Sequence, residues 1–376
     1  MFEYVKGFCD SFLDRGMPGF DIEICRDTKR VFRYMNGYSD VENGVKMNGG
    51  ERYNIYSCSK PITCTSALQL YERGLFSLDD KLACYMPEFD NMTVQTPNGI
   101  KKAEKPILIK HLFEMTAGFT YDCRSELLQR AINDTDGKCP TRQTIGYLAG
   151  QPLSFEPGEK WQYSLCHDVL AALVEQISGQ PFEDYVKENI FSPLGMDNST
   201  FMLPEEQINT VCPLYRFENG KAQRVDNHII PYKIGTQFAS GGAGCVSTLD
   251  DYMKFINGLY SYKLLKKETV DLMSTDRLNN CIKDAYWHRD NHGYGLGVRC
   301  PAHNGNFSDF GWDGAAGAYL AIDIQSGITV FFACHLLSNP VQNMYPMLYR
   351  LIKAEMTDIN VQPVLDELKQ LYNYTF

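Results

Sequence analysis

The chain has 376 residues, 44% of them hydrophobic, which is enough for a sizeable core in one large domain or two closely packed ones. Its net charge is −10 and it contains no basic run, so we expect no nucleic-acid partner. Helix-like and strand-like stretches both occur, which favours an α/β or α+β class.

Targeting and redox features favour a cytoplasmic protein. The N-terminal stretch MFEYVKGFCDSFLDRG lacks the continuous apolar core of a signal peptide, and no apolar run approaches the length of a membrane span. The 13 cysteines are scattered and odd in number, which fits reduced thiols better than a disulfide framework. His288 and His292 lie in a loop-like stretch, so we expect no metal site. The oligomeric state is left open.

The N-terminal part predicts a helix, two strands and a second helix. Apolar residues fall at helical spacing over 2–13, and 19–25 and 31–38 read as strands joined by a short turn. Residues 57–73 contain no glycine and are followed by Gly74, so a helix should begin at Ser57. Its apolar residues point several ways around the axis, so we expect it to be buried on most sides.

Helices dominate the middle of the chain, and strands return near its end. Helices are expected at 107–118, 125–132, 167–177 and 181–190. Ser247 or Thr248 can cap another helix. Later strands are expected at 294–299, 317–324 and 328–335, and closing helices at 344–356 and 364–372.

This order of elements predicts one antiparallel sheet built from both ends of the chain and flanked by helices. Residues 1–80 and 206–376 would form the α/β sheet lobe, and 81–205 an inserted, mostly helical lobe. We expect an active-site cleft between the two lobes.

The first candidate site is Ser57 with Lys60, three residues further along the predicted helix. Residues at that spacing share one helix face, so a hydroxyl, an amine and the helix N-terminus would converge in a mostly apolar setting. Burial disfavours a charged amine, and a neutral amine can take a serine proton. The alternative is a capping serine beside a solvated lysine.

Two other segments can complete such a site. Tyr163 follows a Pro-Gly turn and precedes a long helix, so its phenol can project into a cleft and share the proton traffic. The glycine-rich stretch 311–317 leads into a strand, and its small residues allow a backbone N–H to approach a bound carbonyl. The alternatives are a packed core tyrosine and a loop around a buried tryptophan.

These residues carry a family resemblance that covers nearly the whole chain. Ser57 and Lys60 in IYSCSKPIT match an S-x-x-K box, and Tyr163 in EPGEKWQYSL matches the tyrosine of a Y-x-N box. The segments HLFEMTAGF, VEQISGQPFEDYVKENIFSPLGM and GGAGCVSTLDDYMKF look like the standard connecting segments of the same family. The chain thus resembles the class C-like branch of the serine β-lactamase and penicillin-binding-protein superfamily, which includes carboxylesterases, D-amino-acid peptidases and acyltransferases.

The sequence departs from that pattern in two places. Leu165 stands where the second box has asparagine. The third box, normally K-T-G or H-x-G, corresponds to Trp312-Asp313-Gly314, with His303-Asn304-Gly305 as the alternative. We prefer Trp312 because two strands joined by a hairpin turn follow it at once. In this family the third-box cation and the second-box asparagine are taken to bind β-lactam and peptide substrates. A second box with leucine and a third box with tryptophan instead resemble the esterase and transesterase members.

The resemblance implies a serine hydrolase that cleaves a carboxylic ester through an acyl-enzyme and needs no cofactor. Ser57 would be the nucleophile, with Lys60 and Tyr163 as its proton relay. The substrate would be a small-molecule ester or amide. The other expected site residues are the backbone N–H groups of Ser57 and Ala315 as oxyanion hole, and Trp312, Gly314 and Leu165 at the substrate.

Three other functions remain open at this point. The same nucleophile can act on a β-lactam or a D-amino-acid peptide, or pass the acyl group to an alcohol or amine acceptor. A non-enzymatic binding module that kept the fold is a fourth reading. An α/β-hydrolase is disfavoured because the sequence has no G-x-S-x-G elbow.

Overall fold

The computed structural model describes residues 2–225, 232, 234–278, 282–289, 291–302, 307–357 and 359–374. The helices are α1 (Glu3–Asp14), α2 (Ser59–Glu72), α3 (Ile109–Phe113), α4 (Glu126–Asp134), α5 (Thr141–Gly146), α6 (Cys166–Ser178), α7 (Phe182–Val186), α8 (Ser192–Leu194), α9 (Leu249–Tyr260), α10 (Lys267–Met273), α11 (Tyr345–Met356) and α12 (Gln362–Tyr372). The strands are β1 (Gly19–Arg26), β2 (Lys29–Asp40), β3 (Val45–Lys46), β4 (Arg52–Asn54), β5 (Thr93–Thr96), β6 (Gly99–Lys102), β7 (Leu214–Glu218), β8 (Lys221–Val225), β9 (Val246–Thr248), β10 (His292–Tyr294), β11 (Arg299–Pro301), β12 (Tyr319–Asp323), β13 (Ile328–Cys334) and β14 (Leu336–Leu337).

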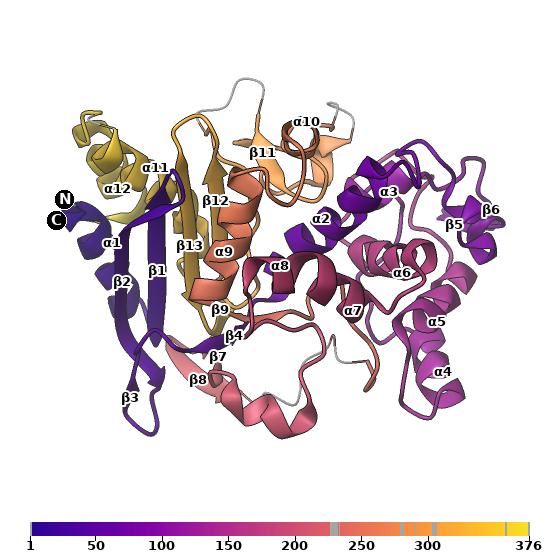
Figure 1. Cartoon of the computed structure of the whole chain (residues 1–376), viewed down its shortest axis with the longest axis horizontal. Coiled ribbons are helices and arrows are strands. Elements are labelled where there is room, and N and C mark those ends of the chain that lie inside the picture. Colours follow the sequence, from indigo (N-terminus) through magenta and orange to yellow (C-terminus); the bar gives the residue numbers. More distant parts are fainter. Residues whose placement is uncertain are drawn as a thin grey trace.

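The main sheet joins the two ends of the chain, as the sequence predicts. Its strand order is β12-β13-β1-β2-β3, and neighbouring strands are antiparallel. The central pair β1 and β13 runs in register from Phe20 opposite Cys334 to Arg26 opposite Ile328. The sheet therefore closes only when the last hairpin meets the first one, and Figure 1 shows the two termini beside each other.

Side chains of the sheet alternate between two buried layers. Phe20, Ile22 and Ile24 of β1 pack in one core cluster with α1 and α11. On the opposite face lies α9, where the ring of Phe331 stacks on Tyr252 with centroids 4.2 Å apart. This period of two is what a sheet covered on both faces requires.

Helix α2 is buried almost all round, which confirms the expectation. It packs against α6 on the helical side of the molecule, to the right in Figure 1. Its hydroxyls return to the helix backbone: Thr65 donates to the carbonyl of Pro61 at 2.7 Å, and Ser66 donates to that of Ile62 at 3.0 Å. These polar side chains can therefore lie on the buried faces of α2 without unpaired hydroxyl donors.

Several expected elements differ in extent. The helix expected at 107–118 is only α3, because the chain leaves helical geometry at Met115, where φ is 56°. The strand expected at 294–299 is instead the turn between β10 and β11. The helix expected at 181–190 begins as α7 and continues through a π-helical turn, Lys187–Phe191, into α8. The small hairpins β5–β6 and β7–β8 were not expected.

Among the residues that the structure describes, no helix combines the length and the apolar composition needed to cross a membrane.

One buried carboxylate joins the last hairpin of the sheet to α11. Asp323 accepts hydrogen bonds from Tyr349 at 2.5 Å, Lys353 at 2.9 Å and Ser308 at 2.6 Å. Burial raises its pKa, but these hydrogen bonds outweigh that effect and lower the pKa to about 2. A depressed carboxyl pKa stabilises the fold above the unfolded-state value of about 3.9, and the contribution is lost as the pH falls towards 2.

We expect Asp323→Asn to lower the free energy of unfolding by about 2–3 kcal/mol at neutral pH, because one pKa unit corresponds to about 1.4 kcal/mol. Denaturant unfolding of wild type and variant at several pH values measures this. The gap should close below about pH 4, as wild type loses the same charge. The exposed Asp90→Asn is the matched control. A gap that does not change with pH would contradict an ionic origin.

Candidate active site

Ser57 lies in a one-turn 3-10 helix, Tyr56–Cys58, between β4 and α2. The turn begins with Tyr56 at φ 48°, a left-handed conformation that side chains rarely adopt. The hydroxyl of Tyr252 on α9 donates to the carbonyl of Cys58 at 2.6 Å and thereby ties this turn to the sheet layer. Ser57 is 8% exposed, so its hydroxyl is held by a rigid and nearly buried backbone.

Lys60 is fully buried and points at Ser57. Its Nζ donates to Ser57 Oγ at 3.1 Å and to the carbonyl of Gly242 at 2.6 Å. It also lies 4.5 Å from the ring centre of Tyr163 and 5.4 Å from that of Tyr121. The lysine is 0% exposed, so the alternative of a solvated surface lysine is wrong.

Tyr163 comes from the segment just before α6 and reaches the same hydroxyl. Its phenol donates to Ser57 Oγ at 2.5 Å. Its ring stacks on Tyr121, with centroids 5.1 Å apart and 11° between the planes, and on Trp312 at 6.0 Å. Ser57 Oγ therefore accepts hydrogen bonds from a buried amine and from a phenol that aromatic packing keeps in place.

Asp168 acts on Lys60 through the Gly242 backbone, which it holds in place. The sequence reasoning missed this residue. This buried carboxylate of α6 accepts hydrogen bonds from Ser240 Oγ at 2.6 Å and from the N–H of Gly242 at 3.3 Å. Burial raises the pKa of Asp168, and the hydrogen bond from Ser240 opposes that rise. Position 242 needs glycine because a Cβ there would lie 2.6 Å from the Asp168 carboxylate. The available signal was an acidic residue directly before the apolar run 169–174 of α6.

The third box runs against the backbone that precedes Ser57. A Cβ on Gly314 would lie 2.4 Å from the carbonyl oxygen of Ile55, so only glycine allows this approach. The next residue, Ala315, lines the same cavity as Ser57. Among the hydrogen bonds of the described residues, none uses the N–H of Ala315 as donor. That N–H is therefore available to a bound oxygen.

A cavity of about 460 Å³ opens at Ser57. It brings Trp312 and Ala315, but not Gly314, together with Ser57 and Tyr163. It adds five residues that sequence reasoning did not select: Trp287, His288, Asp313, Gln342 and Asn343. Leu165 is not part of this lining. It is 4% exposed at the start of α6, and its N–H bonds the carbonyl of Thr120 at 3.1 Å. His303, the alternative third-box residue, lies outside the described residues.

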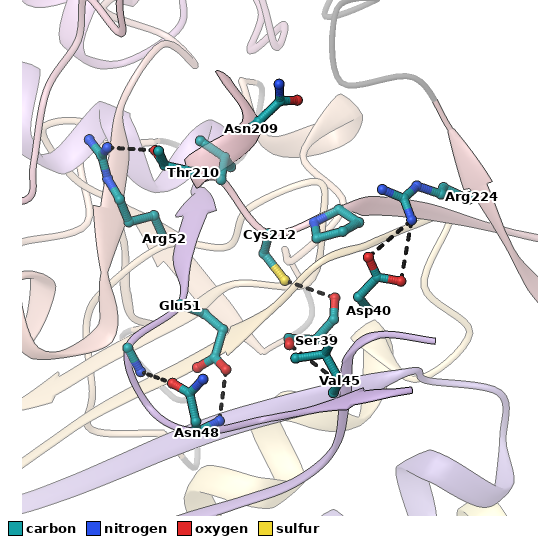
Figure 2. A pocket seen from close by; sticks show the side chains of 13 residues that line it. Ser39, Asp40, Val45, Asn48, Glu51, Arg52, Asn209, Thr210, Cys212 and Arg224 are labelled. Carbon is teal, nitrogen blue, oxygen red and sulfur yellow. Dashed lines mark hydrogen bonds and ion pairs between the residues drawn. The ribbon is translucent and has the colours of Figure 1, made fainter. Parts of the chain in front are cut away.

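A second pocket, of about 400 Å³, contains none of the predicted site residues (Figure 2). Its charged side chains are engaged within its own wall. Arg224 donates to Asp40 at 3.1 Å, and Arg52 donates to Thr210 at 2.9 Å. Glu51 accepts the N–H of Asn48 at 2.7 Å. These pairings leave the Ser57 cavity as the stronger candidate for chemistry.

A serine hydroxyl that meets a buried amine and a phenol in a cavity is the arrangement of a serine nucleophile. The fold and the site therefore define a serine hydrolase, or an acyltransferase of the same kind. Residues 4–352 match the Beta-lactamase family, and the chain belongs to that family.

Similar proteins include enzymes of both kinds. Esterase EstB from Burkholderia gladioli is 28% identical over 285 residues, which cover 70% of this chain and 71% of EstB. The ML-236A carboxylate methylbutanoyltransferase mlcH from Penicillium citrinum is 30% identical over 232 residues, or 58% of this chain and 54% of mlcH. The solved structure of EstCE1, a hydrolase with promiscuous acyltransferase activity, superposes with a TM-score of 0.76 at 24% identity, covering 92% of this chain and 96% of that one.

We expect Asp168→Asn to lower kcat by about tenfold to a hundredfold, because it would displace Lys60, the candidate proton acceptor, from Ser57 Oγ. Turnover of a short-chain aryl ester and thermal unfolding should be measured together. The matched control is Asp251→Asn, since Asp251 is also a buried carboxylate that accepts a backbone N–H, that of Asn198 at 2.7 Å, outside the cavity. Equal losses of kcat in both variants would show that Asp168 acts only through stability.

Proposed function

We propose that this protein hydrolyses a carboxylic ester through an acyl-enzyme on Ser57. The observation that carries the proposal is the double contact of Ser57 Oγ, with Lys60 at 3.1 Å and Tyr163 at 2.5 Å, at the mouth of an aromatic cavity. A hydroxyl is a weak nucleophile unless a neighbouring base removes its proton, and this pair offers two groups that can exchange one.

The proposed reaction has two halves. Ser57 Oγ forms a bond to the ester carbonyl carbon, and its proton passes to the Lys60–Tyr163 pair. The C–O bond to the alcohol then breaks, and the pair returns the proton to the departing oxygen. In the second half a water molecule gives a proton to the same pair as its oxygen bonds to the acyl carbon. The bond between that carbon and Ser57 Oγ then breaks, the pair returns the proton to Oγ, and the acid leaves. Atoms and charges balance without a cofactor.

The negative charge that develops on the ester carbonyl oxygen must be stabilised by hydrogen-bond donors. We propose the backbone N–H groups of Ser57 and Ala315 for this role. The close approach of Gly314 to the carbonyl of Ile55 supports this assignment, because it brings the third box against the Ser57 turn. Fixed backbone donors of this kind stabilise developing negative charge by about 2.7–4 kcal/mol each. We assign Trp312 to the wall of the substrate pocket, and we omit Leu165 because it does not line the cavity.

The lining favours a neutral substrate over a β-lactam or a D-peptide. Among the described lining residues none is lysine or arginine, and burial lowers the pKa of His288 to about 3, so that it is neutral at working pH. The cavity thus offers no evident cation for a substrate carboxylate. Acyl transfer is the second candidate, favoured by the 30% identity to a methylbutanoyltransferase, because an alcohol can replace water in the second half of the reaction.

We expect wild type to cleave short-chain aryl esters with a kcat/KM at least one decade above that for a chromogenic cephalosporin, because a charge-assisted hydrogen bond to the lactam carboxylate is missing. Ser57→Ala serves as the blank and should lose several orders of magnitude in kcat without a change in melting temperature. Added alcohol with product analysis detects acyl transfer. A Ser57→Ala enzyme that retains more than about one percent of kcat would overturn the assignment.

If Lys60 and Tyr163 form one relay, their mutations should be strongly non-additive. We expect Lys60→Ala and Tyr163→Phe each to lower kcat by more than about a hundredfold, and the double variant to lose little more than the worse single one. Steady-state kinetics on the three variants, each checked for folding by circular dichroism, measures the coupling. Losses that add fully would mean that only one of the two residues shares the proton.

A further inference from the structure

Asp313 adds a carboxylate to the Ser57 cavity, and the proposed reaction does not use it. Its side chain is 14% exposed and belongs to the cavity lining. Its Oδ1 is buried and, among the residues that the structure describes, has no hydrogen-bond partner. A buried carboxylate oxygen without a donor is unfavourable in an empty site, so a ligand that supplies a donor or a positive charge would be favoured.

The surrounding charges do not neutralise this carboxylate. The buried guanidinium of Arg299 faces two acids, with Asp309 at 2.9 Å from its Nη2 and Asp313 at 3.9 Å from its Nε. Because the shorter contact belongs to Asp309, a single positive charge is shared unequally between two carboxylates. Burial raises the pKa of Asp313 to about 6, and Arg299 opposes that rise only in part.

The other described groups near the carboxylate do not supply the missing charge. Nε2 of His288 lies 3.8 Å from Oδ2 of Asp313, but burial lowers the pKa of His288 to about 3 and that of His292 to about 2. Lys60, on α2, is fully buried and engaged with Ser57 and Gly242. A cation that enters the cavity would therefore meet an ionised and incompletely paired acid at neutral pH.

Aromatic faces surround the same space. The rings of Trp287 and Trp312 lie 6.2 Å apart, and Tyr163 lies 5.0 Å from Trp287 and 6.0 Å from Trp312. Trp287 is 55% exposed although it belongs to this group, so part of its surface is uncovered. Aromatic faces beside a carboxylate suit an ammonium or quaternary ammonium group, which they attract without strong hydrogen bonds.

We propose that Asp313, with the faces of Trp287 and Trp312, binds a positively charged ammonium-type group of the substrate. The inference rests on the proposed function, since it places that group in an ester whose carbonyl is attacked by Ser57. Asp313 would then determine specificity, drawing cationic esters into the cavity and repelling anionic ones.

Binding of a probe tests the site without any turnover. Phenyltrimethylammonium and its neutral isostere tert-butylbenzene can be titrated against tryptophan fluorescence, because all 3 tryptophans of the chain belong to one group of contacting rings around Tyr163. We expect Asp313→Asn to lower the affinity for phenyltrimethylammonium by about tenfold and to leave the affinity for tert-butylbenzene unchanged. The control Asp90→Asn should match wild type. Equal affinities of wild type and Asp313→Asn for the cation would overturn the proposal.

Wild type alone provides a second measurement if Asp313→Asn folds poorly. Affinity for phenyltrimethylammonium should rise with pH through about 6 as the Asp313 carboxyl ionises, while affinity for tert-butylbenzene stays constant. Of the other described groups near the carboxylate, Arg299 is charged throughout, and His288 and His292 are neutral throughout this range. Burial also raises the pKa of Asp309, which contacts Arg299 but does not line the cavity, so the pH dependence assigned to Asp313 must be absent in folded Asp313→Asn protein. A cation affinity that does not change with pH would contradict a role for the carboxylate.

Turnover then separates the two proposals. Choline butyrate and 3,3-dimethylbutyl butyrate have the same shape and differ by one charge. We expect the ratio of their kcat/KM values to fall by about tenfold in Asp313→Asn. An unchanged ratio despite probe binding would show that the cation site does not serve the substrate. Probe binding without any ester turnover by wild type would overturn the proposed function and not the cation site.

Discussion

The active site depends on how the fold accommodates the buried amine of Lys60. A lysine amine carries two N–H donors when neutral and three when protonated, and burying these donors without partners is strongly unfavourable. Here Ser57 Oγ and the carbonyl of Gly242 accept two hydrogen bonds, and the ring of Tyr163 lies beneath the nitrogen. Each of these partners comes from a different part of the chain. Satisfying one buried group therefore brings the 3-10 turn, the 240–244 turn and the start of α6 into contact.

Those partners are in turn fixed by contacts that reach the rest of the fold. Tyr252 connects the Cys58 carbonyl to α9, whose ring stack with Phe331 reaches the central sheet. Asp168 holds the Gly242 turn from α6. The site is therefore built where the sheet layer meets the helices, and its geometry depends on long-range contacts that form only in the complete fold.

The difference between local patterns and long-range contacts explains what the sequence could predict. Spacing is local, so the S-x-x-K pair, the hairpin β12–β13 and the alternation in β1 all follow from neighbouring residues, although α2 begins at Ser59 and leaves Ser57 in the 3-10 turn before it. The contact of Tyr163 with Ser57 was reached through the family's motif, because a lone tyrosine gives no such signal. The lobe boundaries at 81 and 205 stay a prediction.

The features that could not be predicted from the sequence depend on contacts between residues far apart in the chain. Residues 294–299 look like a strand, but position 297 has φ +83° and a Cβ there would meet the sulfur of Cys64 at 2.2 Å, so the chain turns. Trp287 and His288 come from an irregular segment, and nothing local to them indicates that they reach Trp312. Leu165 illustrates the opposite error, since a motif position suggested contact with substrate while packing placed the residue in the core.

If Trp312 occupies the third box as proposed, the exchange would change the sign of the electrostatic field at a bound substrate. A cation at position 312 would attract a carboxylate, whereas an indole supplies one N–H donor and an apolar face. At the next position the chain places Asp313, which Arg299 balances only in part. Two like charges about 6 Å apart repel by about 3 kcal/mol at an effective dielectric of about 20, or roughly two decades in affinity. On the proposed function, losing the cation and gaining the acid would act in the same direction, and together they would disfavour negatively charged substrates at Ser57.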